Sequence, residues 1–227
     1  MNFDDLFDRA AEYDVDNETV SAALAERRSN PETAETAKRN DATQTESNDT
    51  TGHVDNPPTN GEPTPARVVA DVDVLAADFL VGGASREALD LLRSHSWTTL
   101  VASDLLLDDA ESVIAALADS KVAADWRAIV EEWRISVTHP PDDHPALASA
   151  YHGGAMQIVS LDSSLTGPGT AAGLRDRMPV SVREPRAFAT VFSPERLYPE
   201  AVGGEYPGPD RDPRSMRRVS VDEDQHR

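Results

Sequence analysis

The 227-residue sequence contains no cysteine. Disulfide bonds, thiol catalysis and zinc sites built on cysteine are therefore excluded. No run approaches the roughly 20 consecutive apolar residues of a transmembrane helix, and the acidic N-terminus MNFDDLFDRA lacks the apolar stretch of a signal peptide. These absences lead us to expect a cytoplasmic protein with no membrane association.

Basic residues are scarce, and lysine is almost absent. The chain has 41 acidic residues against 21 basic ones, a formal net charge of −20, and its lysines are Lys38 and Lys121. Such a composition is typical of proteins that work in molar salt, where the Debye length falls to about 3 Å and self-repulsion is screened. We therefore expect a halophilic protein, whose acidity reflects its solvent rather than its ligand.

Large apolar residues are missing from residues 29–65, which contain no Leu, Ile, Phe, Trp, Tyr or Met. A stretch of this kind cannot bury enough apolar surface to offset the entropy lost on ordering, which predicts a disordered acidic linker. The linker separates a short helical N-terminal segment, 1–28, from a domain at 66–200. Residues 201–227 are predicted to form a flexible C-terminal tail.

The N-terminal segment has one clear apolar pattern. Phe3, Leu6, Phe7 and Ala10 fall on one face of a short helix, and a second helical stretch follows at 17–28. Two interpretations stay open: a marginal helix pair at the chain end, or a docking helix for a protein partner. The sequence also leaves open whether the chain forms a homodimer.

The domain at 66–200 alternates between strand and helix patterns. Strands are expected at 67–75, 98–102, 135–137, 156–161 and 180–183, with helices between them. This alternation predicts an α/β fold with a mostly parallel sheet and helices on both faces. Ligands of such sheets bind at the carboxyl ends of the strands.

Acidic residues collect at those predicted strand ends. Asp71 ends the apolar run VVAD, Asp162 ends IVSLD, and Asp108 and Asp109 follow the strand TTLVA. Asp143 opens the helix before IVSLD. Clustered carboxylates repel one another unless a divalent cation lies between them, and such hard oxygen ligands suit Mg²⁺ or Mn²⁺. Asp71 is thus the leading candidate for a metal ligand.

Several stretches together resemble the motifs of PIN-domain nucleases. VVADVDVLAADFL resembles the first motif, ASDLLLDDAESVI the second, and DHPALASAYHGGAMQIVSLD the third and fourth. VSVREPRAFATVF resembles the closing strand and helix of the family. The resemblance covers about 66–192, nearly all of the predicted domain.

This resemblance implies a Rossmann-like three-layer α/β sandwich with Mg²⁺- or Mn²⁺-dependent phosphodiester cleavage, generally of RNA. It implies a catalytic quartet whose members are Asp71, Asp109, Asp143 and Asp162, the metal being held by Asp71, Asp143 and Asp162. Asp73 and Ser160 match supporting positions. The second acid of the family is usually Glu, so that Asp108 and Glu111 compete with Asp109. Pro140, Pro141 and Pro145 also depart from the family's regular lead-in to its third acid.

Other interpretations of the same residues stay open. A PIN-like domain without catalysis would serve as a binding or regulatory module. DVDVL also resembles the nucleophile loop of haloacid-dehalogenase-like phosphatases, with Asp71 as nucleophile and Asp73 as acid/base, although Lys121 is the only lysine in the domain. Structurally, Asp143 could cap a helix, Asp109 could favour a helix dipole and Asp162 could stand in a turn.

Overall fold

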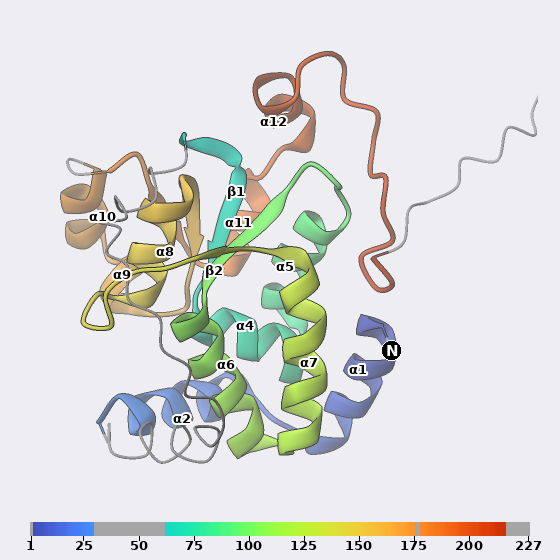
Figure 1. Cartoon of the computed structure of the whole chain (residues 1–227), viewed down its shortest axis with the longest axis vertical. Coiled ribbons are helices and arrows are strands. Elements are labelled where there is room, and N and C mark those ends of the chain that lie inside the picture. Colours follow the sequence, from blue (N-terminus) through green and yellow to red (C-terminus); the bar gives the residue numbers. More distant parts are fainter. Residues whose placement is uncertain (1, 30–61, 176–177, 217–227) are drawn as a thin grey trace, which may run out of the picture.

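The computed structural model describes residues 2–29, 62–175 and 178–216. Five parallel strands form one sheet in the order β3-β2-β1-β4-β5. They are β1 (Thr64–Ala70), β2 (Thr99–Ser103), β3 (Arg134–Val137), β4 (Ala155–Val159) and β5 (Ser181–Arg183). Helices lie on both sides of this sheet (Figure 1), which confirms the predicted three-layer α/β sandwich.

The helices divide between the two faces of the sheet. One layer contains α4 (Val72–Leu80), α5 (Gly83–Arg93), α6 (Asp104–Leu117), α7 (Ser120–Trp133) and α11 (Pro185–Val191). The other contains α8 (Pro145–Gly153), which contacts four strands, with α9 (Ser163–Thr166) and α10 (Pro168–Arg175) beside it (Figure 1). Gly153 marks a close approach, because a Cβ there would lie 2.2 Å from Cγ1 of Val101 in β2.

The first predicted strand is too long. It was expected over 67–75, but β1 ends at Ala70, and residues 72–80 form α4. Every residue of α4 is buried, so the segment has no polar face from which a helical period could be recognised. A further helix, α12 (Pro194–Ala201), has no counterpart among the predicted elements, because Pro199 in its interior is a poor helix signal. Pro194 occupies the first turn, where its missing N–H is not needed.

Two side chains cap the helices that follow them. The Ser103 hydroxyl accepts a hydrogen bond from Leu106 N at 3.2 Å, and the Asp119 carboxylate accepts from Lys121 N at 2.7 Å. Asp143 does not cap α8, because the residue at the cap position is His144, whose side chain makes no capping bond. These local signals therefore place the starts of α6 and α7 in the chain.

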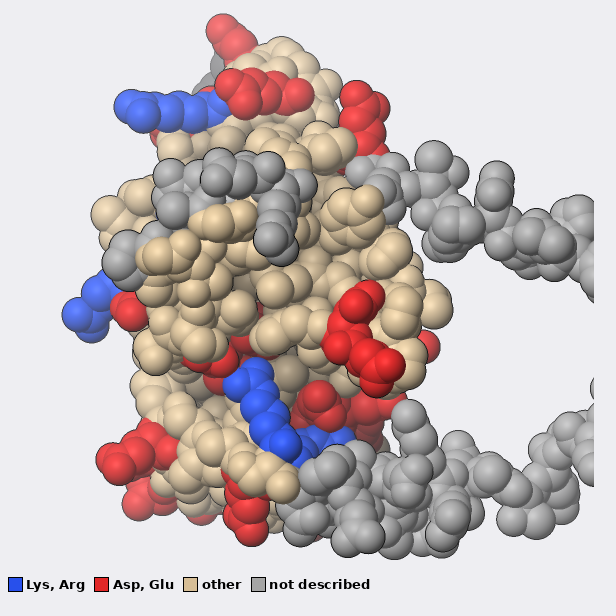
Figure 2. All heavy atoms as spheres, turned by 90° about the vertical axis from the view of Figure 1, so that its left-hand side faces the viewer, with Lys and Arg blue, Asp and Glu red and all other residues tan. Residues whose placement is uncertain are grey.

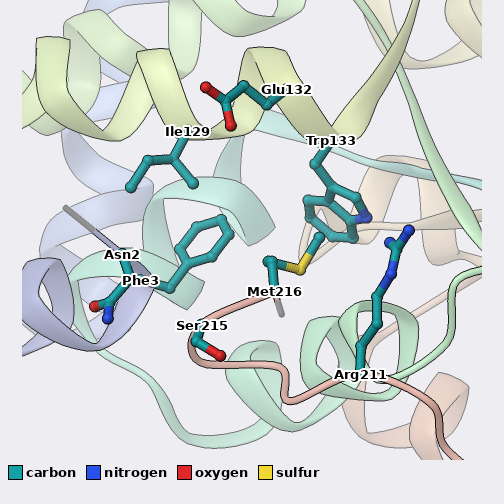
Figure 3. Close-up of a pocket in the computed structure, with 8 residues that line it drawn as sticks. All are labelled: Asn2, Phe3, Ile129, Glu132, Trp133, Arg211, Ser215 and Met216. Atoms are coloured by element: carbon teal, nitrogen blue, oxygen red, sulfur yellow. The ribbon is translucent and has the colours of Figure 1, made fainter. Parts of the chain in front are cut away.

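The N-terminal segment packs on the domain as α1 (Phe3–Ala10), a short 3₁₀ turn η1 (Ala11–Tyr13) and α2 (Asn17–Ser29). The apolar stripe predicted for α1 is buried against α4 and α7. Figure 3 shows the Phe3 ring pointing toward Ile129 and Trp133 of α7 and toward Met216. The predicted linker lies mostly outside the described residues, and its last two residues, 64–65, begin β1.

The C-terminal segment begins with contacts to the domain. Asp210 N and Arg211 N both donate to Ser94 O, and the Tyr206 hydroxyl lies 2.6 Å from His95 Nε2. Within the predicted tail, Tyr206, Asp210 and Arg211 therefore contact the domain, and 217–227 lies outside the described residues. Across the described ranges, no helix has the length and hydropathy needed to cross a bilayer.

Candidate acidic site

Asp71 and Asp73 lie at the carboxyl end of β1, the central strand. Asp71 is the N-cap of α4, and its Oδ1 accepts a hydrogen bond from Val72 N at 2.9 Å. Asp73, in the first turn, accepts from Val74 N at 2.6 Å. The two residues are only 1% and 3% exposed. The switch from strand to helix thus buries two carboxylates that are two residues apart.

Ser160 joins this pair to the end of the neighbouring strand, β4. Its hydroxyl donates to Oδ2 of Asp71 at 2.9 Å and lies 3.5 Å from Oδ2 of Asp73. Leu161 N donates to the same Asp73 oxygen at 3.1 Å, and Asp162 N donates to the Ser160 hydroxyl at 3.0 Å. Parallel pairing of β1 with β4 brings these residues together across almost 90 positions of sequence.

The electrostatics of the pair are unusual. Neither Asp71 nor Asp73 forms an ion pair with any described residue; their recorded partners are one hydroxyl and backbone amides. Burial, and next the charge of Asp71, raise the pKa of Asp73 to about 7, against the opposing effect of hydrogen bonds from Leu161 N and Val74 N. Near neutral pH this carboxyl group is therefore poised between its two protonation states.

Asp162 is the next acid in this network and begins α9. Its Oδ1 accepts from Ser164 N at 2.8 Å, and its Oδ2 accepts from Nη1 of Arg28 in α2 at 3.0 Å. Burial alone would raise the pKa of Asp162, but the hydrogen bonds from Ser164 and Arg28 outweigh it and lower the pKa. Asp162 is thus ionised and already neutralised by a guanidinium group.

The two neighbouring acids of α6 face different elements. Asp109 accepts from Nε of Arg27 in α2 at 2.9 Å, whereas Asp108 accepts from Nη1 of Arg127 in α7 at 2.9 Å. Arg127 also approaches Glu111, at 4.0 Å. Of the three competing acids, Asp109 is therefore the one on the side of α2.

Asp143 stands apart from this network. It lies in the turn between β3 and α8, where its N–H donates to Pro140 O at 3.2 Å and its side chain is exposed. The structure thus connects four of the predicted residues through hydrogen bonds: Asp71, Asp73, Ser160 and Asp162. Asp109 forms an ion pair with Arg27 beside this network, and Asp143 is not connected to it by a hydrogen bond among those described.

An open groove of about 470 Å³ runs beside these carboxylates. Leu24, Ala25 and Arg28 of α2 form one wall, and the opposite wall consists of residues at the sheet edge, including Asp73, Leu161 and Asp162. Figure 2 faces the side of the molecule where α2, α8 and α9 lie, and shows basic side chains in a hollow with acidic side chains around it. The acidic site is therefore reachable from solvent at the groove.

The carboxylate oxygens of Asp71 and Asp73 are the type of ligand that a hard divalent cation prefers. Mg²⁺ is usually held by one or two carboxylates together with water and substrate phosphates, and the Asp71–Asp73 pair supplies two carboxylates without a cation. Within the described ranges no group of three or more His, Asp or Glu side chains is arranged to hold a metal ion. Asp162, the nearest further acid in the network, is instead turned to Arg28.

Sequence reasoning did not identify Arg27 and Arg28 as part of this site. The only local signal is two adjacent arginines at the end of a predicted helix in a strongly acidic chain. Their partners, Asp109 and Asp162, lie 82 and 134 positions away. Asp73, expected in a supporting position, has the most strongly shifted carboxyl pKa of the site.

The comparisons with known proteins bear on the domain and not on its N-terminal helices. No curated protein and no solved structure gave a significant match. A family model matches residues 62–214, from just before β1 into the C-terminal segment, so α1 and α2 precede the matched region. The chain belongs to a family of unknown function (DUF7384).

Proposed function

We propose that this protein is a metal-dependent phosphodiester hydrolase that cleaves RNA. The observation that carries the proposal is the Asp71–Asp73 pair, two buried carboxylates that form no ion pair with a described residue, at the carboxyl end of the central strand and beside an open groove. Strongly perturbed carboxyl groups in a cleft are characteristic of functional sites. The resemblance of four motifs to PIN-domain nucleases supports the same activity.

Each residue of the site has a role in this proposal. Asp71 and Asp73 would hold Mg²⁺ or Mn²⁺, and Asp162 is the further carboxylate beside them. When bound, the ion would supply a water of lowered pKa and neutralise charge on the phosphate. The Ser160 hydroxyl fixes the orientation of the Asp71 carboxylate through its hydrogen bond. Asp109 and Asp143 are the acids farther out, facing α2 and solvent.

RNA is the proposed substrate, in a cytoplasm of molar salt. At that salt concentration, contacts that depend only on charge are weak, so the strand would be held mainly at the metal and in the groove. Leu24 and Leu161 give this groove an apolar part beside its carboxylates. This combination suits a single strand, whose bases can leave the stack and contact apolar surface.

A binding module without catalysis is the second candidate. The ion pairs Arg27–Asp109 and Arg28–Asp162 favour it, because they neutralise two of the four expected catalytic acids. The phosphatase alternative is weaker. Its basic residue would have to be Lys121, the only lysine of the domain, which is exposed at the start of α7.

The test is cleavage of a labelled single-stranded RNA in molar KCl, with Mn²⁺ or with EDTA. The proteins are the wild type, Asp71→Asn and Asp162→Asn, with Asp108→Asn as the matched control, since Asp108 faces Arg127 outside the network. We expect cleavage that requires Mn²⁺, survives in the control and is lost in the two site variants. No cleavage, together with no rise in melting temperature on adding Mn²⁺, would leave the binding module as the better interpretation.

A further inference from the structure

The two N-terminal helices are attached to the domain in different ways. The anchor, α1, buries Phe3, Leu6, Phe7 and Ala10, and the Arg86 guanidinium carbon lies 3.7 Å from the centre of the Phe7 ring. The backbone of α1 is also bonded to the C-terminal segment, because Asp4 N donates to Arg214 O at 3.2 Å. Apolar burial of this extent makes α1 a firm attachment.

By contrast, α2 has little apolar attachment. Of its 13 residues, Val20 and Leu24 are buried. Its remaining hold on the domain includes the ion pairs of Arg27 with Asp109 and of Arg28 with Asp162. The side chains of Arg28 and Asp109 are 45% and 37% exposed, so both pairs lie where solvent screens them and each is weak.

Arg28 contacts Asp162, which the proposed function places beside the metal site, and Arg27 contacts Asp109, farther out on α6. Oδ2 of Asp162 accepts from Arg28 at 3.0 Å, and a carboxylate oxygen engaged in this way is not free to ligate a cation. The helix lies between α6 and α9, with Asp109 on one side and Asp162 on the other. A guanidinium group and a divalent cation would therefore compete for the same carboxylate.

We propose that α2 is an intramolecular gate over the acidic groove, with Arg27 and Arg28 as its latch and α1 as its anchor. The proposal rests on the proposed metal-dependent activity. In the latched state Oδ2 of Asp162 accepts a hydrogen bond from Arg28. When α2 moves away, Asp162 becomes free to join Asp71 and Asp73.

Competition for one carboxylate makes the coupling reciprocal. If the latch weakens the binding of a cation, the cation weakens the latch by the same factor. Because the pairs are exposed, molar salt also weakens the latch, since the Debye length is then about 3 Å. The gate is therefore expected to open with divalent cation and to open more readily as KCl concentration rises.

The test is Mn²⁺ binding to the full chain, followed through the EPR signal of free Mn²⁺ at low and at molar KCl. The latch variant is Arg27→Ala with Arg28→Ala. The matched control is Arg9→Ala, which also removes an arginine that joins the N-terminal segment to the domain, through Asp125 on α7 and away from the groove. We expect at least fivefold tighter binding in the latch variant at low salt, a smaller difference at molar KCl, and less than a twofold change in the control.

Hydrogen–deuterium exchange supplies an independent readout. Adding Mn²⁺ should speed exchange in residues 17–29 and leave residues 3–10 unchanged, and Asp71→Asn should abolish this response. Slower exchange in 17–29, or weaker Mn²⁺ binding by the latch variant, would overturn the gate and make α2 a wall of the site. Equal affinity in wild type and latch variant would also overturn the gate but leave the proposed function standing. No Mn²⁺ binding in any variant would overturn both.

Discussion

Asp71, Asp73 and Asp78 are buried in or next to α4, and they differ in their hydrogen-bonding partners. Asp78 accepts hydrogen bonds from both Nη1 and Nη2 of Arg93 at 2.8 Å, and Arg93, itself fully buried, is also bonded to Asp90. Asp71 and Asp73, at the other end of the helix, have a hydroxyl and backbone amides as partners. The same residue type is thus neutralised by an ion pair at one end of α4 and held without an ion pair to a described residue at the other.

This difference separates a structural acid from a functional one. The Asp78–Arg93 pair joins α4 to α5 inside the apolar layer, where both side chains are buried. Asp73 instead faces the groove with a raised pKa, an arrangement that disfavours the folded state at neutral pH. Groups held at a cost to stability are expected where they serve a ligand.

The largest effect is expected from Arg93→Met, which keeps most of the side-chain volume but removes the charge. Asp78 would then lose both hydrogen bonds from Arg93 and keep the more distant Arg86, 3.9 Å away, as a cation nearby, and removing one partner of a buried ion pair typically costs about 3–5 kcal/mol. Urea unfolding in molar KCl measures this loss. A loss below about 1 kcal/mol would mean that the ion pair with Arg93 contributes little to stability. The contrast between Asp78 and the Asp71–Asp73 pair would then fail.

The next effect has the opposite sign and comes from Asp73→Asn. In the unfolded chain Asp73 ionises near its ordinary pKa of 3.8, whereas in the folded protein it does so near 7. Between these values the unfolded state has released a proton that the folded state still holds. The contribution of this group to stability therefore falls as pH rises from about 4 to about 7 and stays low above that.

Asp73→Asn removes this loss. In EDTA the variant should be more stable than wild type at pH 8 by roughly 2–4 kcal/mol, with the gain shrinking toward zero at pH 4. Urea unfolding across this pH range measures the difference. A variant that is less stable than wild type at pH 8, and by the same amount at pH 4, would show that Asp73 is a structural acid like Asp78.

A smaller effect is expected from Ser160→Ala. Oδ2 of Asp71 would lose its hydroxyl donor and Asp162 N its acceptor, and an unsatisfied buried group typically costs about 1–3 kcal/mol. The matched control is Ser112→Ala, whose hydroxyl bonds Asp108 O within α6, and it should change stability by no more than about 0.5 kcal/mol. Equal losses in the two variants would argue against a special role for the Ser160 hydroxyl.

The smallest effect on stability is expected from the latch variant, Arg27→Ala with Arg28→Ala. Partly exposed ion pairs contribute about 0–1 kcal/mol each, so losing the two pairs should change the unfolding free energy by roughly 2 kcal/mol at most. Thermal and urea unfolding at low KCl provide the measurement. A loss comparable to that of Arg93→Met would place the two arginines among the structural groups and remove the basis of a gate.

Much of the fold follows from local patterns in the sequence. Strands and helices alternate as predicted, Ser103 and Asp119 cap their helices, and the stripe of Phe3, Leu6 and Phe7 packs as an apolar helix face. These features depend on neighbouring residues and on burial of one face. The position of Asp71 at the end of a strand next to the sheet's carboxyl edge belongs to the same class.

Other features were decided by the tertiary structure. A fully buried segment carries no periodicity, so only its surroundings make residues 72–80 a helix rather than the end of a strand. Ser160 reaches Asp71, and Arg28 reaches Asp162, across 89 and 134 positions, because the parallel sheet and the packing of α2 bring them together. The sequence alone determined which acids stand at strand ends. The tertiary structure decided which of these acids form an ion pair, since that depends on which arginine packs beside each carboxylate.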